Sequence, residues 1–286
     1  MTGTLFVVAT PIGNLEDLTF RALRTLKTVD LIAAEDTRRT AKLLAHYEIQ
    51  KALVSLREHN EVRETPRLIA RIRRGEQIAL VTDAGTPGIA DPGARLVRAA
   101  HDAGLRVVPI PGPSAVTSAL SVSGFSEPRF TFMGFPPRSG SDRERWFMRL
   151  SETPGVAVFF EAPHRIDQTI GHMTSIVGDR SVVICREITK INEHVDFIAQ
   201  LNVTPSGLKP LGEFVVVVGP KRQHEPSSDD VERAVDLFGR ITHLAGVEDR
   251  LALSMVSSAS GLEGYTIKNA VKKRRILVKQ QNKPES

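Results

Sequence analysis

Short apolar runs alternate with helical patterns through the first 124 residues, and this alternation is the strongest constraint on the fold. The runs cover residues 5–10, 31–35, 52–56, 77–82 and 106–110, and helical patterns follow near 18–28, 38–47, 61–74, 94–103 and from 114 onward. Strands that alternate with helices are typical of a parallel sheet covered by helices. Residues 1–124 are therefore predicted to form an α/β domain.

A second series of apolar runs follows a break at residues 124–128. The runs cover residues 130–134, 156–161, 181–187, 194–199 and 213–218, with a loop expected at 136–141 and a helix near 165–176. Because the last three runs have no helices between them, a mixed or antiparallel sheet is predicted. We place a second α/β domain at residues 125–222.

The chain beyond a polar, linker-like segment at residues 221–230 has helical patterns. Segments 250–259 and 267–278, with a turn-like stretch at 261–264, are typical of a helix-turn-helix in a small domain at residues 228–286. From Lys268 onward the formal charge is +6, although the whole chain carries only +5. This concentration of charge suggests a polyanionic partner, nucleic acid first. A solvated helix face and a purely structural helical hairpin are the alternatives.

The composition of the chain, and the known motifs that it lacks, exclude several classes of protein. With 41% hydrophobic and 25% charged residues, the chain is typical of a globular protein. Its apolar runs are too short to span a membrane, and the N-terminus lacks a secretory-signal pattern, so a cytoplasmic protein is expected. The single cysteine, Cys185, is predicted to lie in the core. The signatures of dinucleotide, P-loop, esterase and zinc-protease sites are absent, and no metal site is expected.

Dense turns of Gly, Pro, Asp and Thr follow the strands of the first domain. They are Thr10-Pro11-Ile12-Gly13-Asn14, Glu35-Asp36-Thr37-Arg38, the segment 83–93, and Pro111-Gly112-Pro113-Ser114-Ala115. In a parallel sheet these turns share the edge where ligands of open α/β folds bind. Ordinary turn chemistry explains any one of them. Segment 83–93 is longer than a strand-to-helix connection needs, and it is predicted to be a binding loop.

These turns resemble the motifs of the ribosomal RNA small subunit methyltransferase I family, in the tetrapyrrole-methylase-like superfamily. The resemblance extends to Phe160-Glu161-Ala162-Pro163-His164-Arg165, Arg186-Glu187-Ile188-Thr189-Lys190 and Gly212-Glu213-Phe214, and it covers about residues 4–220. The motif Asp83-Ala84-Gly85-Thr86-Pro87, continued by Asp91-Pro92-Gly93, is the most specific part. The resemblance implies two α/β domains of the tetrapyrrole methylase type with a cofactor cleft between them, plus the small helical domain.

The resemblance also implies a function. It implies 2′-O-methylation of a cytidine ribose in the decoding region of 16S ribosomal RNA, with S-adenosylmethionine as methyl donor. A homodimer acting on 16S ribosomal RNA or the small ribosomal subunit is implied as well. Carried over position by position, the cofactor-binding candidates are Ile12, Thr86, Ile89, Ser114, Ala115, Phe160, Glu213 and Phe214.

A ribose hydroxyl is a weak acid, so a nearby base or a cation that stabilises the forming alkoxide would help methyl transfer. The candidates at the shared edge are Glu35, Asp36, Arg38, Glu161, His164, Arg165, Glu187 and Lys190. A capped helix start for 35–38, a plain helix start at His164 and an ordinary Glu187–Lys190 ion pair are the alternatives. The candidate RNA contacts are Arg38, His59, Asn60, Lys268, Lys272, Lys273 and Arg275, with Arg138, Arg143 and Arg145 in a polar loop between the domains.

Two other functions remain open at this point. A methyltransferase acting on a small tetrapyrrole-like substrate would share the fold, but Gly85-Thr86-Pro87 replaces the Gly-Asp-Pro associated with those relatives, and a porphyrin-like substrate needs no basic tail. A ligand-sensing regulator with a DNA-binding helix-turn-helix predicts sequence-specific duplex binding without turnover.

Overall fold

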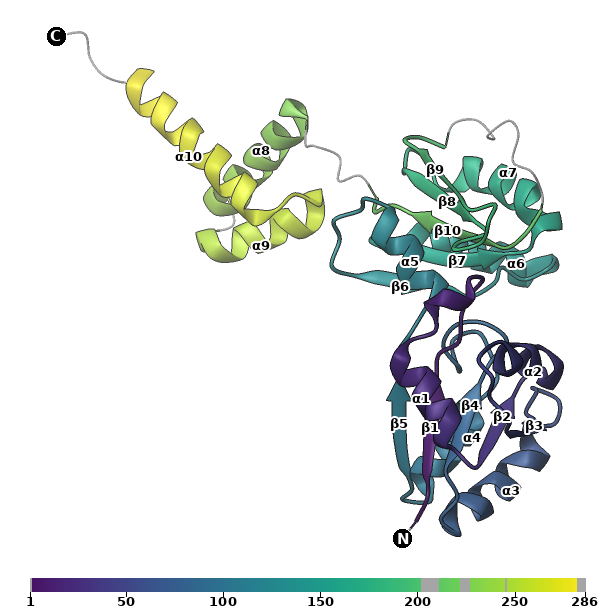
Figure 1. Cartoon of the computed structure of the whole chain (residues 1–286). Coiled ribbons are helices and arrows are strands. Elements are labelled where there is room, and N and C mark those ends of the chain that lie inside the picture. The colour runs from purple at the N-terminus through teal and green to yellow at the C-terminus, as the bar shows by residue number, and fades with distance from the viewer. Residues whose placement is uncertain (1, 202–210, 222–226, 245, 282–286) are drawn as a thin grey trace. The chain divides into compact units, whose positions relative to one another are not determined.

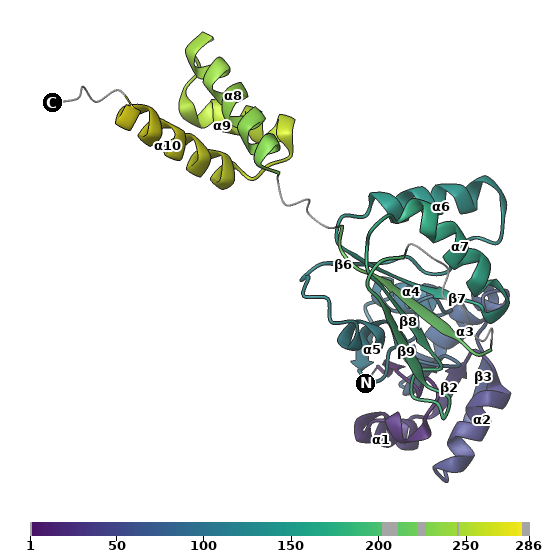
Figure 2. The ribbon, with the colours of Figure 1, turned by 90° about the horizontal axis from the view of Figure 1, so that it is seen from above.

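The computed structural model describes residues 2–201, 211–221, 227–244 and 246–281. The chain forms two compact units, residues 1–221 and 222–286, which are described separately. Figure 1 shows the elements of each unit, and Figure 2 shows the same ribbon from above.

The first unit begins with a five-stranded parallel sheet. Its strands are β1 (Thr4–Val8), β2 (Leu31–Ala34), β3 (Ala52–Ser55), β4 (Ile78–Val81) and β5 (Arg106–Ile110), in the order β3-β2-β4-β1-β5. In register, Leu5 of β1 lies opposite Ile78 of β4 and Val107 of β5. The predicted parallel sheet is therefore confirmed, and its strand order makes β4 a neighbour of both β1 and β2.

Helices cover both faces of this sheet (Figure 1). The helices α1 (Phe20–Thr28) and α2 (Thr37–His46) share one apolar cluster with Val8 and Val81. The helices α3 (Glu61–Arg73) and α4 (Ala94–Asp102) share another cluster with Leu5 and Leu80. Successive strand side chains thus enter opposite layers, which explains why each strand reads as a continuous apolar run. A short 3₁₀ helix, η1 (Leu15–Asp17), lies between β1 and α1.

The second sheet of this unit is mixed. Its strands are β6 (Phe130–Phe132), β7 (Val156–Glu161), β8 (Val182–Arg186), β9 (His194–Ile198) and β10 (Phe214–Val218), in the order β6-β7-β10-β8-β9. Only β6 and β7 pair in parallel, and the other neighbours are antiparallel. Strand β10, the last in sequence, is buried along its whole length at the centre of the sheet.

Two helices on this sheet differ from the sequence-based expectation. The helix α5 (Ala115–Val122), expected with the first domain, packs through Val116 and Ala119 on the second sheet. The helix α6 (Gly140–Glu152) forms where only a polar loop was expected, and it packs beside α7 (Ile166–Ile176) on the opposite face. Both helices are amphipathic, so their partners depend on the sheet they meet rather than on local sequence. A 3₁₀ turn, η2 (Pro163–Arg165), precedes α7.

The C-terminal unit consists, in its described part, of α8 (Ser228–Leu244), α9 (Asp249–Ser260) and α10 (Gly264–Gln281). Phe238, Val256 and Ile267 meet in its core, one from each helix. The helix α9 ends at Gly261, which has a left-handed backbone with φ of +71°. The expected helix-turn-helix thus corresponds to α9 and α10, with α8 packed against both. No helix in the described segments has the length and apolarity needed to cross a membrane.

Candidate active site

Three loops of the first sheet meet because their strands β4, β1 and β5 are neighbours. The backbone N–H of Thr10 donates to the carbonyl of Gly85 at 2.9 Å, and the N–H of Gly85 donates back to Thr10 at 3.0 Å. The hydroxyl of Thr86 contacts the carbonyl oxygen of Pro113 at 3.5 Å. Gly85 has a φ of +78°, a conformation that favours glycine. The loops after β1, β4 and β5 therefore form one continuous rim.

A cavity of about 390 Å³ lies between this rim and the second sheet. The rim contributes Ile12 and residues 84–86, 89–91 and 114–116. The part of the unit that contains the second sheet contributes Phe135, Ile188 and residues 160–163 and 213–215. All eight residues predicted to bind the cofactor lie in this wall, although they come from five separate segments of the sequence. The structure thus brings the motifs of both domains to a single cavity.

Aromatic side chains form part of the cavity wall. The ring of Phe160 packs on that of Phe135, with 5.3 Å between centroids, and on Phe132 at 5.0 Å. The side chain of Phe135 is half exposed. The aromatic rings of this wall offer apolar surface to a planar ligand group.

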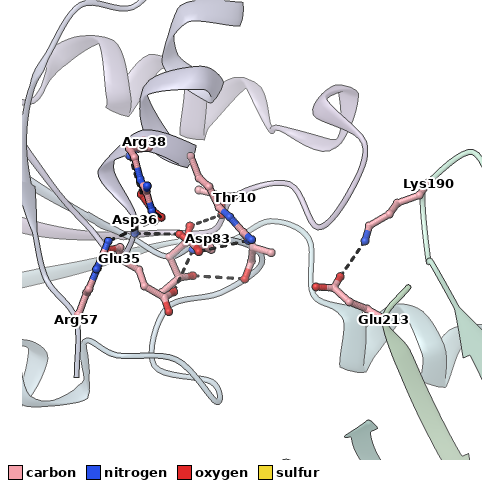
Figure 3. Close-up of polar contacts among 11 residues, drawn as sticks. Thr10, Glu35, Asp36, Arg38, Arg57, Asp83, Lys190 and Glu213 are labelled. Atoms are coloured by element: carbon pink, nitrogen blue, oxygen red, sulfur yellow. Dashed lines mark hydrogen bonds and ion pairs between the residues drawn. The ribbon is translucent and has the colours of Figure 1, made fainter. Parts of the chain in front are cut away.

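Carboxylates gather at the edge of the rim because β2 and β4 pair. The backbone N–H of Asp36 donates to Asp83 Oδ1 at 3.0 Å, and the N–H of Asp83 donates to Glu35 Oε2 at 3.3 Å (Figure 3). Burial, followed by the nearby charge of Asp83, raises the pKa of Glu35. Of these, the sequence predicted Glu35 and Asp36 as site residues.

Asp36 and Arg38 are engaged with each other at the start of α2. Asp36 Oδ1 accepts from the backbone N–H of Arg38 at 2.9 Å, and Asp36 Oδ2 accepts from the Arg38 guanidinium at 2.9 Å (Figure 3). The hydrogen bonds from Arg38 hold the pKa of Asp36 well below its usual range. Arg57 Nη2 lies 3.8 Å from the same carboxylate. Asp36 therefore caps α2, as the alternative interpretation of this motif predicted, while Arg38 stays largely exposed.

Asp91 is a cavity residue that the sequence analysis did not select. It is half-buried in the wall, in the long loop after β4. Burial and then the charges of Glu35 and Asp83 raise its pKa to about 7. The sequence carried one signal, the Asp91-Pro92-Gly93 end of the specific motif, but nothing local placed this carboxyl beside two others.

Glu161 is buried in a closed polar network. Its carboxylate accepts hydrogen bonds from the backbone N–H of Ala162 at 2.8 Å and the hydroxyl of Thr169 at 2.5 Å, and it pairs with Arg165 at 3.2 Å. Arg143 donates to the Thr169 hydroxyl at 2.8 Å and to the carbonyl of Pro137 at 2.9 Å. The prediction that Arg143 contacts RNA is therefore wrong, because its side chain is buried on α6. Arg138 and Arg145 are exposed, and Arg145 pairs with Asp142.

The remaining catalytic candidates lie on the second sheet. Lys190 Nζ lies 2.9 Å from Oε2 of Glu213, a residue of the cavity wall (Figure 3). It also lies 2.8 Å from Glu187 Oε1, so it links two carboxylates. Glu187 also accepts from the backbone N–H of Glu213 at 2.9 Å. His164 is exposed in η2.

The RNA-binding candidates differ in their freedom to contact a ligand. The side chain of Asn60 is used within its own loop, where it accepts from the N–H of Arg57 at 2.7 Å and donates to the carbonyl of Ser55 at 3.1 Å. Its neighbour His59 is exposed. The side chain of Asn60 therefore has a structural role in the loop before α3.

In the C-terminal unit, the four predicted residues of α10 are all exposed; they are Lys268, Lys272, Lys273 and Arg275. Three of them, without Lys273, line a groove of about 490 Å³ together with Arg250 of α9, which the sequence analysis did not select. Arg275 also lies 3.4 Å from Asp249. The helix-turn-helix therefore presents cations from both of its helices.

Over the described segments, no group of three or more His, Cys, Asp or Glu residues is arranged to hold a metal ion. The polar groups at the cavity are carboxylates, hydroxyls and backbone amides. These groups are able to bind a ligand and to exchange protons.

The fold and its cavity define the class to which this protein belongs. The family model described as Tetrapyrrole (Corrin/Porphyrin) Methylases matches residues 4–200. A crystal structure of uroporphyrin-III-C-methyltransferase from Thermus thermophilus matches with a TM-score of 0.52 and 21% identity, over 76% of this chain and 94% of that chain. The molecule thus has the tetrapyrrole methylase fold.

Relatives define the family more narrowly. A Xylella fastidiosa protein named Ribosomal RNA small subunit methyltransferase I is 49% identical over 221 residues, which cover 76% of this chain and 81% of that protein. A Thermotoga maritima protein of the same name is 46% identical over 222 residues, covering 77% of this chain and 99% of that protein. The chain belongs to the ribosomal RNA small subunit methyltransferase I family, which confirms the resemblance inferred from the motifs.

Proposed function

We propose that this protein transfers a methyl group from S-adenosylmethionine to the ribose 2′-oxygen of a cytidine in the decoding region of 16S ribosomal RNA. The observation that carries the proposal is the cavity, whose wall contains all eight motif residues assigned to the donor. Relatives that are 46% and 49% identical bear the name of a small-subunit ribosomal RNA methyltransferase.

The cavity fits the donor in size and chemistry. Its volume of about 390 Å³ lies in the range of small-ligand sites, and the rings of Phe135 and Phe160 suit a planar base. Glu213 brings a carboxylate to the wall, which favours a cationic ligand. Ser114 precedes the N-terminus of α5, where free backbone amides favour a carboxylate. When bound, the donor supplies a methyl group activated by a positively charged sulfur.

The chain's own contribution is mainly to position the reactants. Binding in a cavity between two sheets aligns the reacting groups and limits the access of water. The network of Glu161, Thr169 and Arg165 supports the wall through the backbone of Ala162, while Arg165 also donates to the carbonyl of Pro136. These contacts hold the segments on both sides of Phe160 and Phe135 in place.

The RNA-binding part of the proposal rests on charge. Lys268, Lys272 and Arg275 line a groove on the C-terminal unit with Arg250, and cations on a helix-turn-helix suit a phosphate backbone.

The homodimer implied by the family resemblance is part of the proposal. Sedimentation at the mass of two chains would support it.

Two alternatives have weaker support. A small tetrapyrrole-like substrate is suggested by the name of the matched family model and by the Thermus thermophilus structure, but a 21% identity speaks for the fold alone. A ligand-sensing regulator would bind duplex DNA sequence-specifically and would not turn over the donor. Neither explains why the relatives are named for ribosomal RNA.

The decisive experiment uses donor labelled in its methyl group and small ribosomal subunits from cells that lack this modification. Incorporation into one cytidine, at the ribose 2′-oxygen, is the expected result, with fully modified subunits as the matched control. Label on a base, or on both kinds of subunit alike, contradicts the proposal. Donor binding by calorimetry without transfer to RNA would favour a small-molecule substrate.

A further inference from the structure

Three carboxylates line the cavity, and their surroundings differ. Glu161 is fully engaged by Ala162, Thr169 and Arg165. Glu213 pairs with Lys190 and is mostly exposed. Asp91 has no Arg, Lys or His nitrogen within ion-pair distance in the part of the chain that the structure describes. It is thus the cavity carboxylate whose proton-accepting oxygens are not occupied by a cation.

The groups that face Asp91 come from two neighbouring strand ends. Glu35 follows β2, and Thr82 and Asp83 follow β4; the Thr82 hydroxyl, which donates to the carbonyl of Ala84 at 3.4 Å, is the neighbour that lowers the pKa of the Asp91 carboxyl. The two arginines that act on Glu35 pair with other carboxylates, since Arg39 lies 3.4 Å from Asp83 and Arg57 lies 3.8 Å from Asp36. Burial and the two negative charges raise the pKa of Asp91 to about 7, the range in which a carboxyl can act as a base at neutral pH.

The loop around Asp91 is held in an unusual backbone conformation. Ala90 has a φ of +62°, although it is not a glycine, and Gly88 and Gly93 also have positive φ. A side chain at Gly93 would lie 2.7 Å from a methyl group of Leu80. The N–H groups of Gly93 and Arg95 both donate to Glu61 Oε1 at 3.1 Å. Strain of this kind, fixed by surrounding contacts, is typical of functional loops.

We propose that Asp91 is the proton acceptor for the substrate hydroxyl during methyl transfer, an inference that rests on the proposed function. As the hydroxyl oxygen forms its new bond to the methyl carbon, its O–H bond breaks and the proton moves to a carboxylate oxygen of Asp91. The bond between methyl carbon and sulfur breaks, and its electron pair stays on the sulfur as a neutral thioether. Solvent then takes the proton from Asp91.

The test compares the wild-type protein with Asp91→Asn and with Asp102→Asn, an exposed carboxylate on α4 whose partner is Arg98. We expect Asp91→Asn to lower kcat by about 100-fold or more, because general bases contribute roughly 10²–10⁴-fold. Its donor affinity by calorimetry should stay within about threefold of wild type. The wild-type kcat/KM for the donor should rise about tenfold per pH unit below pH 7 and level off above it, because kcat/KM reports the ionisation of the free enzyme and the base has a pKa near 7. A kcat for Asp91→Asn close to that of Asp102→Asn overturns the inference.

A second measurement does not depend on turnover. In protein with ¹³C-labelled aspartate carboxyls, the resonance absent from Asp91→Asn should titrate near pH 7 in the donor-free wild type. If every aspartate carboxyl of the wild type titrates near pH 4 or below, the inference is overturned, and this result needs no variant. A wild-type protein that methylates no RNA contradicts the proposed function and this inference together, whereas an active Asp91→Asn variant contradicts the inference alone.

Discussion

The backbone N–H of Asn14 donates a hydrogen bond to Thr189 Oγ1 at 3.1 Å, and this bond joins the loop after β1 to the turn between β8 and β9. Thr189 and Glu187, both in that turn, have φ values of +67° and +52°. Such values are uncommon outside glycine. The contact between the two halves of the first unit is thus made by a strained turn, one residue away from Lys190 and its two carboxylate partners.

Gly13 is predicted to be necessary for this contact. A Cβ there would lie 2.4 Å from Cγ of Lys190 and 3.1 Å from Thr189 Oγ1. Gly13→Ala should therefore push the turn away and weaken donor binding by about tenfold, measured by calorimetry. The matched control is Gly171→Ala on α7, where nothing lies within 4 Å of the new methyl group. Equal donor affinities for the two variants would contradict the prediction.

Asp36 is predicted to act as a helix cap. Asp36→Asn should keep the thermal midpoint and most of the activity, because asparagine accepts the same backbone hydrogen bond. Asp36→Ala should lower the midpoint by a few degrees, since the first turn of α2 loses its cap. If Asp36→Asn unfolds like wild type but loses methyl transfer, then the carboxylate has a chemical role beyond the cap.

The pH dependence of stability should reveal the charge environment of Asp91. Folding raises its pKa from an ordinary 3.8 to about 7, so the folded protein holds a proton that the unfolded chain releases between these values. The protonated Asp91 therefore contributes its full share of the free energy of unfolding at low pH, and this contribution is lost as the pH rises toward and through 7. Asp91→Asn should melt close to wild type at pH 4 and several degrees higher at pH 8. A melting difference that does not change with pH would show that Asp91 titrates normally.

The cationic groove of the C-terminal unit is predicted to bind RNA through its charges. Replacing Lys268, Lys272 and Arg275 by alanine should weaken RNA binding and lower the slope of log affinity against log salt by about 2, at about 0.7 per lost contact with single-stranded RNA. Donor affinity should not change. Lys27→Ala, an exposed lysine on α1, is the control for a nonspecific loss of charge. An unchanged salt slope in the triple variant would exclude direct phosphate contacts by these residues.

Local sequence predicted the central strands well because β2, β4 and β10 are buried on both faces. Strand β10, with five consecutive buried residues from Phe214 to Val218, is the clearest example. The helix α6 escaped prediction because residues 140–145 are glycine, polar or charged, and the apolar residues Trp146, Phe147 and Leu150 lie only in its second half. The partner of α5 depends on which sheet it meets, which its own eight residues do not encode.

In the candidate site, too, local motifs predicted some residues, whereas contacts between distant segments determine others. The motif turns predicted where a ligand would bind, and their eight residues line one cavity, while their role in donor binding stays a prediction. Asp91 was missed because its environment is created by strand order. Glu35 and Asp83 are 48 residues apart in sequence and come together only because β2 pairs with β4. A pattern along the chain carries no direct information about such a neighbour.

The central position of β10 has a consequence for the order in which this protein is made. The first sheet is complete once residue 110 has left the ribosome, so it is able to fold while the rest of the chain is still being synthesised. The second sheet lacks its middle strand until residue 218 has emerged, because β7 and β8 both pair with β10 and not with each other. The cavity takes residues 213–215 from this strand and the residue before it, so a nascent chain completes the cavity wall only about 105 residues after the first sheet is complete.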